Sequence, residues 1–418
     1  MYNFIKSVDE KKFDNFILES SMTSIFSLSV RKDIKEADKR FVGYLVGMED
    51  EKQKLVAVAM LLYKPTSRVR TMWITYGPVL DYKNENLFNK FISEIEKFCK
   101  SLKIDVILIE PPYITKKYDN KLNQIYESDI NIKEYFKELN YEYLGDKDLE
   151  GGFQLRYTSI VDLDCDEKAL LNKLSSSKKS YLNKNDKYYK IRLVEGNVED
   201  LQYLMKYRNQ LAEEKDFNVD PILYYENYYN LVNRDYKARI VKVVIDIDDA
   251  INNMVLELNS LIDKEQDAKE KEKNAIINQI SSLKKRIAEL EDYKAKNACN
   301  GDYVIGCALR LYIKDTMFNI FAHMDKTLTN IGATNVLVYE MMREAREMGY
   351  KYNDLYGIPN PFDKDGKDYN LATFKLEFGG ELVECAGAFK KVLNRKRYIL
   401  FNVFSKINRV VRRKKSCL

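Results

Sequence analysis

Hydrophobic positions in the first 140 residues follow two spacings, one typical of strands and one typical of helices. Short runs rich in Val, Leu, Tyr and Ile predict strands. Other segments place apolar residues three and four positions apart, which gathers them on one face of a helix. The predicted strands are 41–48, 55–63, 71–76 and 105–109, and the predicted helices are 9–18, 85–102 and 132–139. The pattern indicates a β-rich α/β unit of mixed topology.

The same order of elements returns in the second half of the chain. Two neighbouring strand patterns are followed by a helical pattern that Thr334 can cap and Gly349 can end, and then by another strand. The predicted strands here are 303–312, 316–322 and 352–358, and the predicted helices are 166–174, 198–217 and 334–348. Because both halves read strand, strand, helix, strand, we expect two structurally similar α/β units.

One segment inside the second unit has a coiled-coil spacing. Its apolar residues recur at alternating steps of four and three, as the a and d positions of two helices do. The first set is Ile251, Val255, Leu258 and Ile262, and the second set is Ile276, Ile280, Leu283, Ile287 and Leu290. A polar stretch, 263–274, separates the two sets. We predict an antiparallel helical hairpin over 247–298, with a long surface helix packed on the body as the alternative.

The composition excludes several classes of protein and site. Hydrophobic residues make up 45% of the chain, which is enough to build buried cores and excludes wholesale disorder. A single histidine, His323, rules out a multi-histidine zinc site, and none of the 6 cysteines forms a Cys-x-x-Cys pair. Cysteines scattered in this way are typical of reduced thiols in a cytosolic protein. Charged residues interrupt the N-terminus where a signal peptide would lie, and no apolar run approaches the ~18 residues of a membrane span.

Positive charge is concentrated at the C-terminus. From Lys390 onward the sequence contains 11 Lys and Arg residues and no acidic residue, so the rest of the chain is mildly acidic although the net charge is +5. Apolar residues in this segment recur at helical steps, which predicts a helix with one apolar face. These residues are Ile399, Val403, Ile407 and Val410. Such a helix suits an anionic membrane surface or RNA phosphates, while the first part of the segment alternatively packs on the body.

The densest group of candidate residues lies just before the C-terminal segment. Phe374 and Phe378 are four apart, which fits a helical turn, and Gly379 and Gly380 then let the backbone change direction or approach a ligand closely. A lysine beside such a turn, here Lys375, can stabilise negative charge that develops on a substrate oxygen. The alternative is an aromatic-flanked turn with a solvated lysine.

Four other places carry candidate groups. Glu110 ends a buried strand shortly before Tyr113, and a carboxylate at a strand end is a common site position in α/β folds, although carboxylates also simply cap strands. The turn 329–334 resembles a degenerate phosphate-binding turn. It is poor in glycine and lacks positive charge, which favours an ordinary helix N-terminus. The basic stretch 175–187 suits a phosphate-rich ligand or forms a solvated loop. His323, in or beside a strand, is expected to be structural.

The order of these motifs resembles the Fem family of peptidoglycan-branching, tRNA-dependent aminoacyltransferases over nearly the full chain. Tyr76–Asp81 is similar to the family's Gly-Pro strand end, and Ile107–Tyr113 to its strand ending in an acidic residue and Pro. The most specific match is Phe374-Lys375 with Phe378-Gly379-Gly380. Arg156–Leu163, followed by Leu170–Asn185, is similar to the family's Arg-x-Thr…Asp-Leu segment and basic helix. The remaining matches are Ala333–Gly349 with Tyr352–Gly357, and the heptad hairpin.

Two positions depart from the family's pattern. The usual Gln and Trp near the N-terminus are absent around Ser27–Lys35, although Lys35 falls where a substrate-binding lysine is expected. Lys215 replaces an Arg of the helix that precedes Asp-Phe. Both departures concern residues that the family uses to bind the nucleotide-linked sugar.

The resemblance implies an α/β (α+β) fold with mixed sheets, two GNAT-like subdomains and an inserted antiparallel coiled-coil hairpin. The first subdomain is 1–150, the second is 151–246 with 299–389, the hairpin is 247–298 and the basic C-terminal segment, which joins the first subdomain, is 390–418. The implied reaction transfers Gly, Ala or Ser from aminoacyl-tRNA to the stem-peptide side-chain amine of lipid II or of its UDP-linked muropeptide precursor. The reaction needs no metal or other cofactor. The protein is expected in the cytoplasm, at the inner face of the membrane. Both a monomer and a homo-oligomer are compatible with the sequence.

Roles for individual residues follow from the resemblance and from the chemistry of the reaction. Lys375 is expected to stabilise the tetrahedral oxyanion. Glu110 and Glu384 are expected to orient the acceptor amine. The expected substrate-binding residues are Lys35, Lys215, Tyr113, Phe374, Phe378, Gly379 and Gly380.

Two alternatives remain. A coenzyme A-dependent GNAT acyltransferase requires an intact Gly-rich basic turn before the helix at 334–348. A non-catalytic adaptor that binds RNA or a membrane through the hairpin and the C-terminal segment requires that Lys375 be dispensable.

Overall fold

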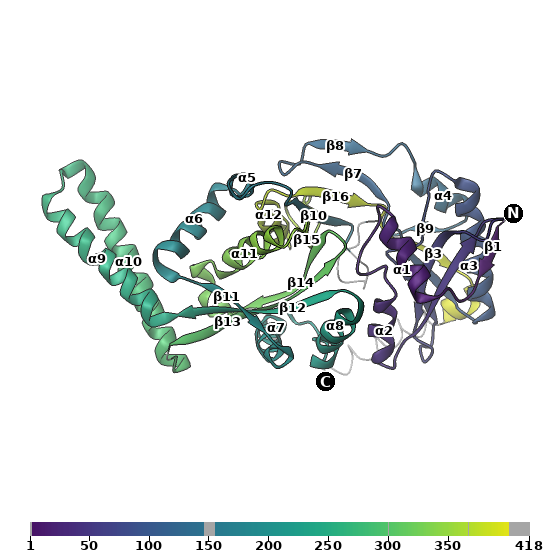
Figure 1. Cartoon of the computed structure of the whole chain (residues 1–418), viewed down its shortest axis with the longest axis horizontal. Coiled ribbons are helices and arrows are strands. Elements are labelled where there is room, and N and C mark those ends of the chain that lie inside the picture. Colours follow the sequence, from purple (N-terminus) through teal and green to yellow (C-terminus); the bar gives the residue numbers. More distant parts are fainter. Residues whose placement is uncertain (1, 146–154, 300, 367, 401–418) are drawn as a thin grey trace, which may run out of the picture. The chain divides into compact units, whose positions relative to one another are not determined.

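The structure is a computed structural model that describes residues 2–145, 155–299, 301–366 and 368–400 (Figure 1). The predicted boundary at 150 and the C-terminal positions 401–418 lie outside the described residues. Backbone contacts divide the chain into two units. Of the described residues, unit 1 takes those within Met1–Ile160, Leu355–Leu376 and Gly380–Leu418, and unit 2 takes those within Val161–Asp354 and Glu377–Gly379.

Unit 1 is built on an eight-stranded mixed sheet whose central strands the hydrophobic pattern predicted. The strand order is β1-β2-β3-β4-β6-β17-β9, and β5 pairs with β3 beside this path. β4 and β6 are parallel, which requires a crossover connection between them. The strands are β1 (Asn3–Ile5), β2 (Val42–Glu49), β3 (Leu55–Tyr63), β4 (Thr71–Thr75), β5 (Val79–Leu80), β6 (Val106–Glu110), β9 (Glu142–Tyr143) and β17 (Phe389–Val392).

Helix α3 makes that crossover and covers one face of the sheet. The Asn84 side chain caps it by accepting a hydrogen bond from the Leu87 N–H at 3.0 Å. Its apolar stripe includes Phe88 and Phe91, both fully buried, and burial of each such ring contributes on the order of 2 kcal/mol. The helices of unit 1 are α1 (Glu10–Glu19), α2 (Val30–Ala37), α3 (Glu85–Ser101), α4 (Ile132–Glu138) and α12 (Tyr369–Leu376).

The C-terminal segment begins inside this sheet. β17 pairs with β6 and β9, and it carries Lys390 and Lys391. Their ammonium groups form ion pairs with Glu142 and Glu96, each at 2.7 Å. The first residues of the segment therefore pack on the body, and residues 395–400 continue as helix.

Unit 1 also contains strands that the sequence pattern did not indicate. β10, β16, β7 and β8 pair antiparallel in that order. β7 and β8 have no run of buried apolar residues. They pair with each other as a local hairpin, and β7 pairs on its other side with β16, which is far away in the sequence. Their bounds are β7 (Ile114–Tyr118), β8 (Gln124–Glu127), β10 (Tyr157–Asp162) and β16 (Glu381–Cys385).

Unit 2 repeats the strand, strand, helix, strand order that the sequence predicted. β11, β12, β13 and β14 pair antiparallel, and β14 pairs parallel with the first residues of β15 after the crossover helix α11. The strands are β11 (Arg192–Gly196), β12 (Lys237–Asp246), β13 (Asp302–Ile313), β14 (Thr316–Met324) and β15 (Tyr352–Ile358). The helices are α5 (Glu167–Lys173), α6 (Ser176–Lys184), η2 (Asn185–Tyr189), η3 (Val198–Asp200), α7 (Leu201–Lys215), α8 (Ile222–Asp235), η4 (Lys326–Ile331) and α11 (Ala333–Glu347).

The sequence predicted the C-terminal end of α11 correctly but not its N-cap. Gly349, at φ +86°, ends the helix as predicted. The predicted cap at Thr334 is wrong, because Gly332 occupies the N-cap position at φ +74°. A side chain at Gly332 would place its Cβ 2.2 Å from the Tyr181 ring of α6, so a tertiary contact selects glycine here.

The predicted helical hairpin is present, formed by α9 (Ile247–Asp267) and α10 (Glu270–Asn297), which contact each other (Figure 1). The predicted seam of α10 is correct from Ile280 to Leu290. The predicted seam of α9 is one residue out of register, because the buried residues are Ile247, Ala250, Met254 and Leu261. The base of α9 packs against η2 and β12, and these contacts, absent from the local pattern, rotate its buried face. The predicted mixed α/β fold with a helical hairpin is therefore confirmed.

The helices α2 and α8 escaped the sequence analysis. α2 is rich in charged residues, and α8 contains several tyrosines on more than one face. α6 lies within Leu170–Asn185, where the family resemblance implied a basic helix. The basic stretch at 175–187 is therefore largely helical, so the loop alternative is wrong for it. Among the described residues, no helix is long and apolar enough to cross a membrane.

Candidate functional site

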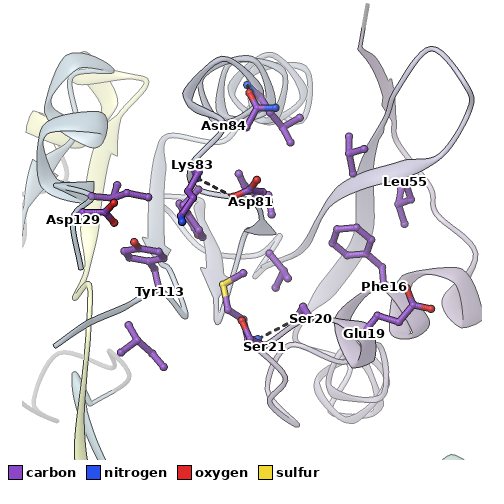
Figure 2. A pocket seen from close by; sticks show the side chains of 18 of the residues that line it. Phe16, Glu19, Ser20, Ser21, Leu55, Asp81, Lys83, Asn84, Tyr113 and Asp129 are labelled. Carbon is purple, nitrogen blue, oxygen red and sulfur yellow. Dashed lines mark hydrogen bonds between the residues drawn. The ribbon is translucent and has the colours of Figure 1, made fainter. Parts of the chain in front are cut away.

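A large cleft lies within unit 1, with a volume of about 1320 Å³ (Figure 2). It is formed by the end of α1, the turn between β2 and β3, the segment from β5 to the start of α3, and residues of β7 and β8. Figure 2 shows Tyr113 and Asp129 on one side, Phe16 and Glu19 on the other, and Asp81 between them. This volume exceeds that of typical small-molecule pockets and suits an extended ligand such as a peptide.

The Gly-Pro motif forms one wall of this cleft. β4 ends at Thr75, and the chain turns through Tyr76-Gly77-Pro78 before β5 and Asp81 reach the cleft. The Tyr82 hydroxyl donates a hydrogen bond to the Pro78 carbonyl at 2.6 Å, which fixes the turn. The motif that carries the family resemblance therefore positions Asp81 and the start of α3 at the cleft.

Negative charge gathers around Tyr113 in the cleft. Burial raises the pKa of the Tyr113 hydroxyl, and the nearby Asp129 and Asp81 carboxylates raise it further, against a hydrogen bond with Ser128 that lowers it. The Tyr113 ring also packs against the buried Tyr82 ring, with a centroid distance of 4.8 Å. An aromatic wall beside two exposed carboxylates can accept an amine-bearing ligand.

Glu110 lies next to the Gly-Pro turn and is buried. It is the last residue of β6, paired in register with Thr75, and its carbonyl accepts a hydrogen bond from the Gly77 N–H at 3.2 Å. It is not among the residues that line the cleft, although Tyr113, three residues later, is. The strand end predicted from the sequence is thus one residue too early, since Glu110 belongs to β6 itself.

The ammonium of Lys375 is held by backbone at the end of β15. Its Nζ donates hydrogen bonds to the carbonyl oxygens of Tyr356 and Gly357, at 3.0 and 2.9 Å. Lys375 lies in the last turn of α12 and is half-buried. The alternative of a solvated lysine is therefore wrong, because carbonyl oxygens fix this charge in place.

Two strained tyrosines stack on one phenylalanine beside this lysine. Tyr356 and Tyr76 both have positive φ, +61° and +51°, a conformation that costs a non-glycine residue on the order of 1 kcal/mol. Their rings contact Phe26 at centroid distances of 5.0 and 5.1 Å. The Arg31 guanidinium lies 4.7 Å from the Phe26 centroid. Backbone strain held by surrounding packing is typical of functional sites.

Glu384 is engaged by two residues of unit 1. Its carboxylate forms an ion pair with Arg156 and accepts a hydrogen bond from the Tyr118 hydroxyl at 2.9 Å. Burial and the bond to this carboxylate raise the pKa of Tyr118 to about 12. Both oxygens of Glu384 are therefore occupied, and its most direct effect is to orient Arg156 and Tyr118.

The residues after Lys375 are clamped by the turn between α5 and α6. The Lys178 ammonium, 4% exposed, lies 3.0 Å from a Glu377 carboxylate oxygen and 5.0 Å from the centroid of the buried Phe378 ring. Gly379 has φ +82°, and a Cβ there would meet the Lys173 carbonyl oxygen at 2.4 Å. The predicted close approach of backbone at this glycine is confirmed, and the approaching group is α5 of the protein itself.

The other predicted binding residues lie on separate elements. Lys35, on α2, lies 5.5 Å from the Phe41 ring centroid in unit 1, whereas Lys215 is an exposed residue at the end of α7 in unit 2. Phe374 is half-buried in α12. Gly380 is buried, and a Cβ there would meet the Ser159 hydroxyl at 2.5 Å. Their roles in substrate binding stay predictions.

The turn before α11 does not resemble an anion site in the structure. A small pocket of about 210 Å³ there is lined by His323, Thr334 and the buried Asp325, whose carboxylate would repel a pyrophosphate. Burial, and then the nearby Arg208, lowers the pKa of His323 to about 4, so the ring is neutral at pH 7. Arg208 Nη1 lies 3.1 Å from His323 Nε2. This arrangement disfavours the coenzyme A alternative.

Sequence reasoning missed the Phe26 stack and the Lys178–Glu377 pair. Nothing local marks Phe26, since its two partners are 50 and more residues away. Lys178 belonged to a recognised basic stretch, but only the tertiary contact with Glu377 distinguishes it from its neighbours. No cluster of three metal-ligating side chains occurs in the part of the chain that the structure describes.

Comparisons with known proteins identify the family. The model of the FemAB family matches residues 8–406. Two proteins named lipid II:glycine glycyltransferase, from strains of Staphylococcus aureus, are each 26% identical, one over 85% of this chain and 84% of its own length, the other over 94% of each. A crystal structure of FemX superimposes with a TM-score of 0.71 at 22% identity, covering 95% of this chain and 99% of that one.

The fold comparison extends to proteins with little sequence similarity. A tandem GNAT protein from the clavulanic acid biosynthesis pathway has a TM-score of 0.51 at 7% identity, covering 94% of this chain and 98% of that one. It shows the fold alone, and it confirms the predicted tandem GNAT-like architecture. Together with the family match over nearly the whole chain, these findings establish that the chain belongs to the FemAB family of aminoacyltransferases.

Proposed function

We propose that this protein transfers Gly, Ala or Ser from aminoacyl-tRNA to the side-chain amine of a peptidoglycan stem peptide, with lipid II or its UDP-linked precursor as acceptor. The observation that carries the proposal is the fixed ammonium of Lys375 at the end of β15, inside the most specific family motif. The glycyltransferase relatives act, by name, on lipid II, which supports a lipid-linked acceptor.

Lys375 is the proposed oxyanion stabiliser. The acceptor amine attacks the ester carbonyl of aminoacyl-tRNA, a C–N bond forms and an electron pair moves onto the carbonyl oxygen. The tetrahedral intermediate collapses by breaking the bond to the ribose oxygen, which takes the proton that the amine releases. An ammonium already held by two carbonyl oxygens needs no rearrangement when the oxyanion appears, and this preorganisation lowers the barrier.

The cleft of unit 1 is the proposed acceptor site. Asp81 and Asp129 surround Tyr113 and suit a peptide that carries an ammonium group, while Val79, Leu80 and other apolar residues supply a wall for its side chains. Glu110 and Glu384 stay proposed amine-orienting groups, and the contacts of Glu384 indicate that it acts through Tyr118 and Arg156.

The test measures transfer of a radiolabelled amino acid to lipid II by purified variants. Lys375→Ala should lower turnover by a factor of ~100–1,000, as loss of an oxyanion-hole donor does, without changing the circular dichroism spectrum. Lys364→Ala, which changes an exposed lysine just before α12, is the matched control and should retain full turnover. Full turnover of folded Lys375→Ala would refute the proposed role.

The C-terminal segment is the proposed membrane contact. Lys390 and Lys391 are used in the sheet, and the Arg397 guanidinium lies 3.6 Å from the buried Asp105 carboxylate. We therefore assign the membrane contact to the other cationic residues from Arg395 onward. Ile399 and Leu400 are each 58% exposed at the end of the described chain. Deleting 408–418 should weaken binding to anionic vesicles and should lower transfer to lipid II more than transfer to the UDP-linked acceptor. Equal losses on both acceptors, with weaker tRNA binding, would contradict the membrane role.

A further inference from the structure

A basic and aromatic surface in unit 2 has no role in the reaction described above. It consists of Tyr181 and Lys184 on α6, Lys187 and Tyr188 on η2, and Arg286 on α10, and we refer to it as the basic–aromatic surface. η2 contacts both α6 and α9, so the surface lies where α6 meets the base of the hairpin (Figure 1).

Two cations of this surface, Lys184 and Arg286, are half-buried, and neither forms an ion pair within 4.0 Å in the part of the chain that the structure describes. Arg286 is hydrogen-bonded to the Tyr189 hydroxyl, and Glu289 and Asp292 line the same small pocket as Arg286. Burial and then the nearby Arg286 lower the pKa of Lys184, so the two like charges oppose each other in the protein alone. Lys187, by contrast, is paired with Glu257 at 2.5 Å. Like charges held together in this way attract a ligand of opposite charge.

Tyrosine rings alternate with these cations. The Lys184 Nζ lies 5.4 Å from the Tyr181 centroid, and the Lys187 Nζ lies 5.3 Å from the Tyr188 centroid. Tyr181 is fixed against Gly332 at the start of α11, which makes its ring a preorganised surface. Cations that neutralise phosphates, interleaved with rings on which bases stack, are typical of proteins that bind single-stranded RNA segments.

We propose that the basic–aromatic surface binds the sugar-phosphate backbone of an RNA, with Lys184 and Arg286 on phosphates and Tyr181 or Tyr188 against bases. The proposed function identifies this RNA as the aminoacyl-tRNA, and the inference rests on that function for the identity of the ligand. An anionic membrane would also attract the cations, and tyrosine rings also lie at membrane interfaces. Tyr181, however, is half-buried and held against Gly332, so its ring can stack on a base without inserting into a bilayer. The interleaved tyrosines therefore favour RNA.

The experiment compares the full chain with the double variant Lys184→Gln/Arg286→Gln and with the control Lys285→Gln. Lys285 is adjacent in sequence to Arg286 but is 79% exposed and lies 4.0 Å from a Glu289 oxygen. The dissociation constant of uncharged tRNA is measured by filter binding between 50 and 300 mM salt. Each phosphate contact contributes roughly 0.7–0.9 to the slope of log K against log salt, so the double variant should lose roughly 1.5 from the slope and bind on the order of tenfold more weakly at the lowest salt.

The outcomes separate this inference from the proposed function. A double variant that is folded and keeps the full slope overturns the basic–aromatic surface, whatever the activity of the protein. A full chain that binds no tRNA while it still binds lipid II overturns the proposed donor, and the assignment of this surface with it. A double variant that loses affinity for anionic vesicles but not for tRNA shows that the surface meets a membrane and contradicts RNA binding.

Discussion

Replacing Glu377 by Gln tests how strongly the ion pair between Lys178 and Glu377 depends on the burial of the Lys178 ammonium. The Lys178 ammonium is 4% exposed, and the Glu377 carboxylate, at 3.0 Å, is 33% exposed. Removing either partner breaks the same ion pair but leaves a different charge behind. Glu377→Gln leaves an ammonium away from water, whereas Lys178→Met leaves a carboxylate that water reaches. The two substitutions should therefore have unequal costs.

The exposed fractions of the two side chains set the expected losses in the free energy of unfolding. Taking the partner from a buried charge costs about 3–5 kcal/mol, which is the expectation for Glu377→Gln. For Lys178→Met, solvation of Glu377 reduces the expected cost to about 1–2 kcal/mol. The double variant Lys178→Met/Glu377→Gln should be more stable than Glu377→Gln alone, because it no longer buries a charge.

The assay is the urea midpoint followed by far-ultraviolet circular dichroism, with hydrogen exchange of the amides at 173–179 as the local measurement. Lys179→Met is the matched control. Lys179 is adjacent in sequence, its Nζ donates a long hydrogen bond to the Asn172 carbonyl, at 3.5 Å, and its loss should leave the midpoint unchanged. If Lys178→Met proves as destabilising as Glu377→Gln, or more so, the reasoning from exposure is wrong.

The pH dependence gives an independent test of the same pair. Burial lowers the pKa of Lys178, against the bond and the attraction of Glu377, which raise it. Below the lowered native pKa both states are protonated, and the burial penalty is fully present. As the pH rises toward 10.5 the native state releases its proton first, so the penalty is relieved. Glu377→Gln lowers the native pKa further, and its stability should approach that of the wild type between pH 7 and 10. A constant difference would contradict this account.

Two further predictions concern His323 and the hairpin. Because the native pKa of His323 is about 4 and its unfolded value is 6.5, its contribution to stability should fall by up to about 3 kcal/mol as the pH drops from 6.5 to 4. His323→Gln should flatten that part of the stability profile, and an unchanged profile would exclude the histidine as its cause. Met254→Ala should cost about 2–5 kcal/mol, since Met254 is fully buried, whereas Val255→Ala, at a position 36% exposed, should cost less than about 1 kcal/mol. If thermal unfolding shows that Val255→Ala is the more destabilising of the two, the buried seam predicted from the sequence is the correct one.

Local patterns were sufficient for the elements that carry their own periodicity. β3 and β15 have the predicted bounds, and α3 and α11 begin and end within one residue of them. The motif that contains Lys375 was also identifiable, because its residues are adjacent in sequence and their spacing needs no partner. The hairpin was predictable for the same reason, since a heptad pattern records the presence of a partner helix.

Tertiary structure alone decided the rest. The pairing of β16 with β7, the seam of α9 and the cap of α11 depend on elements far away in the sequence. In the candidate site, the carbonyl of Tyr356 that holds Lys375 is 19 residues away, the Arg156 that occupies Glu384 is 228 residues away, and Phe26 stacks on Tyr356 across 330 residues. A spacing rule records which face of an element is apolar. It does not record which distant group a charge will meet, and that contact determines whether a lysine is solvated, buried in an ion pair or held by backbone carbonyls.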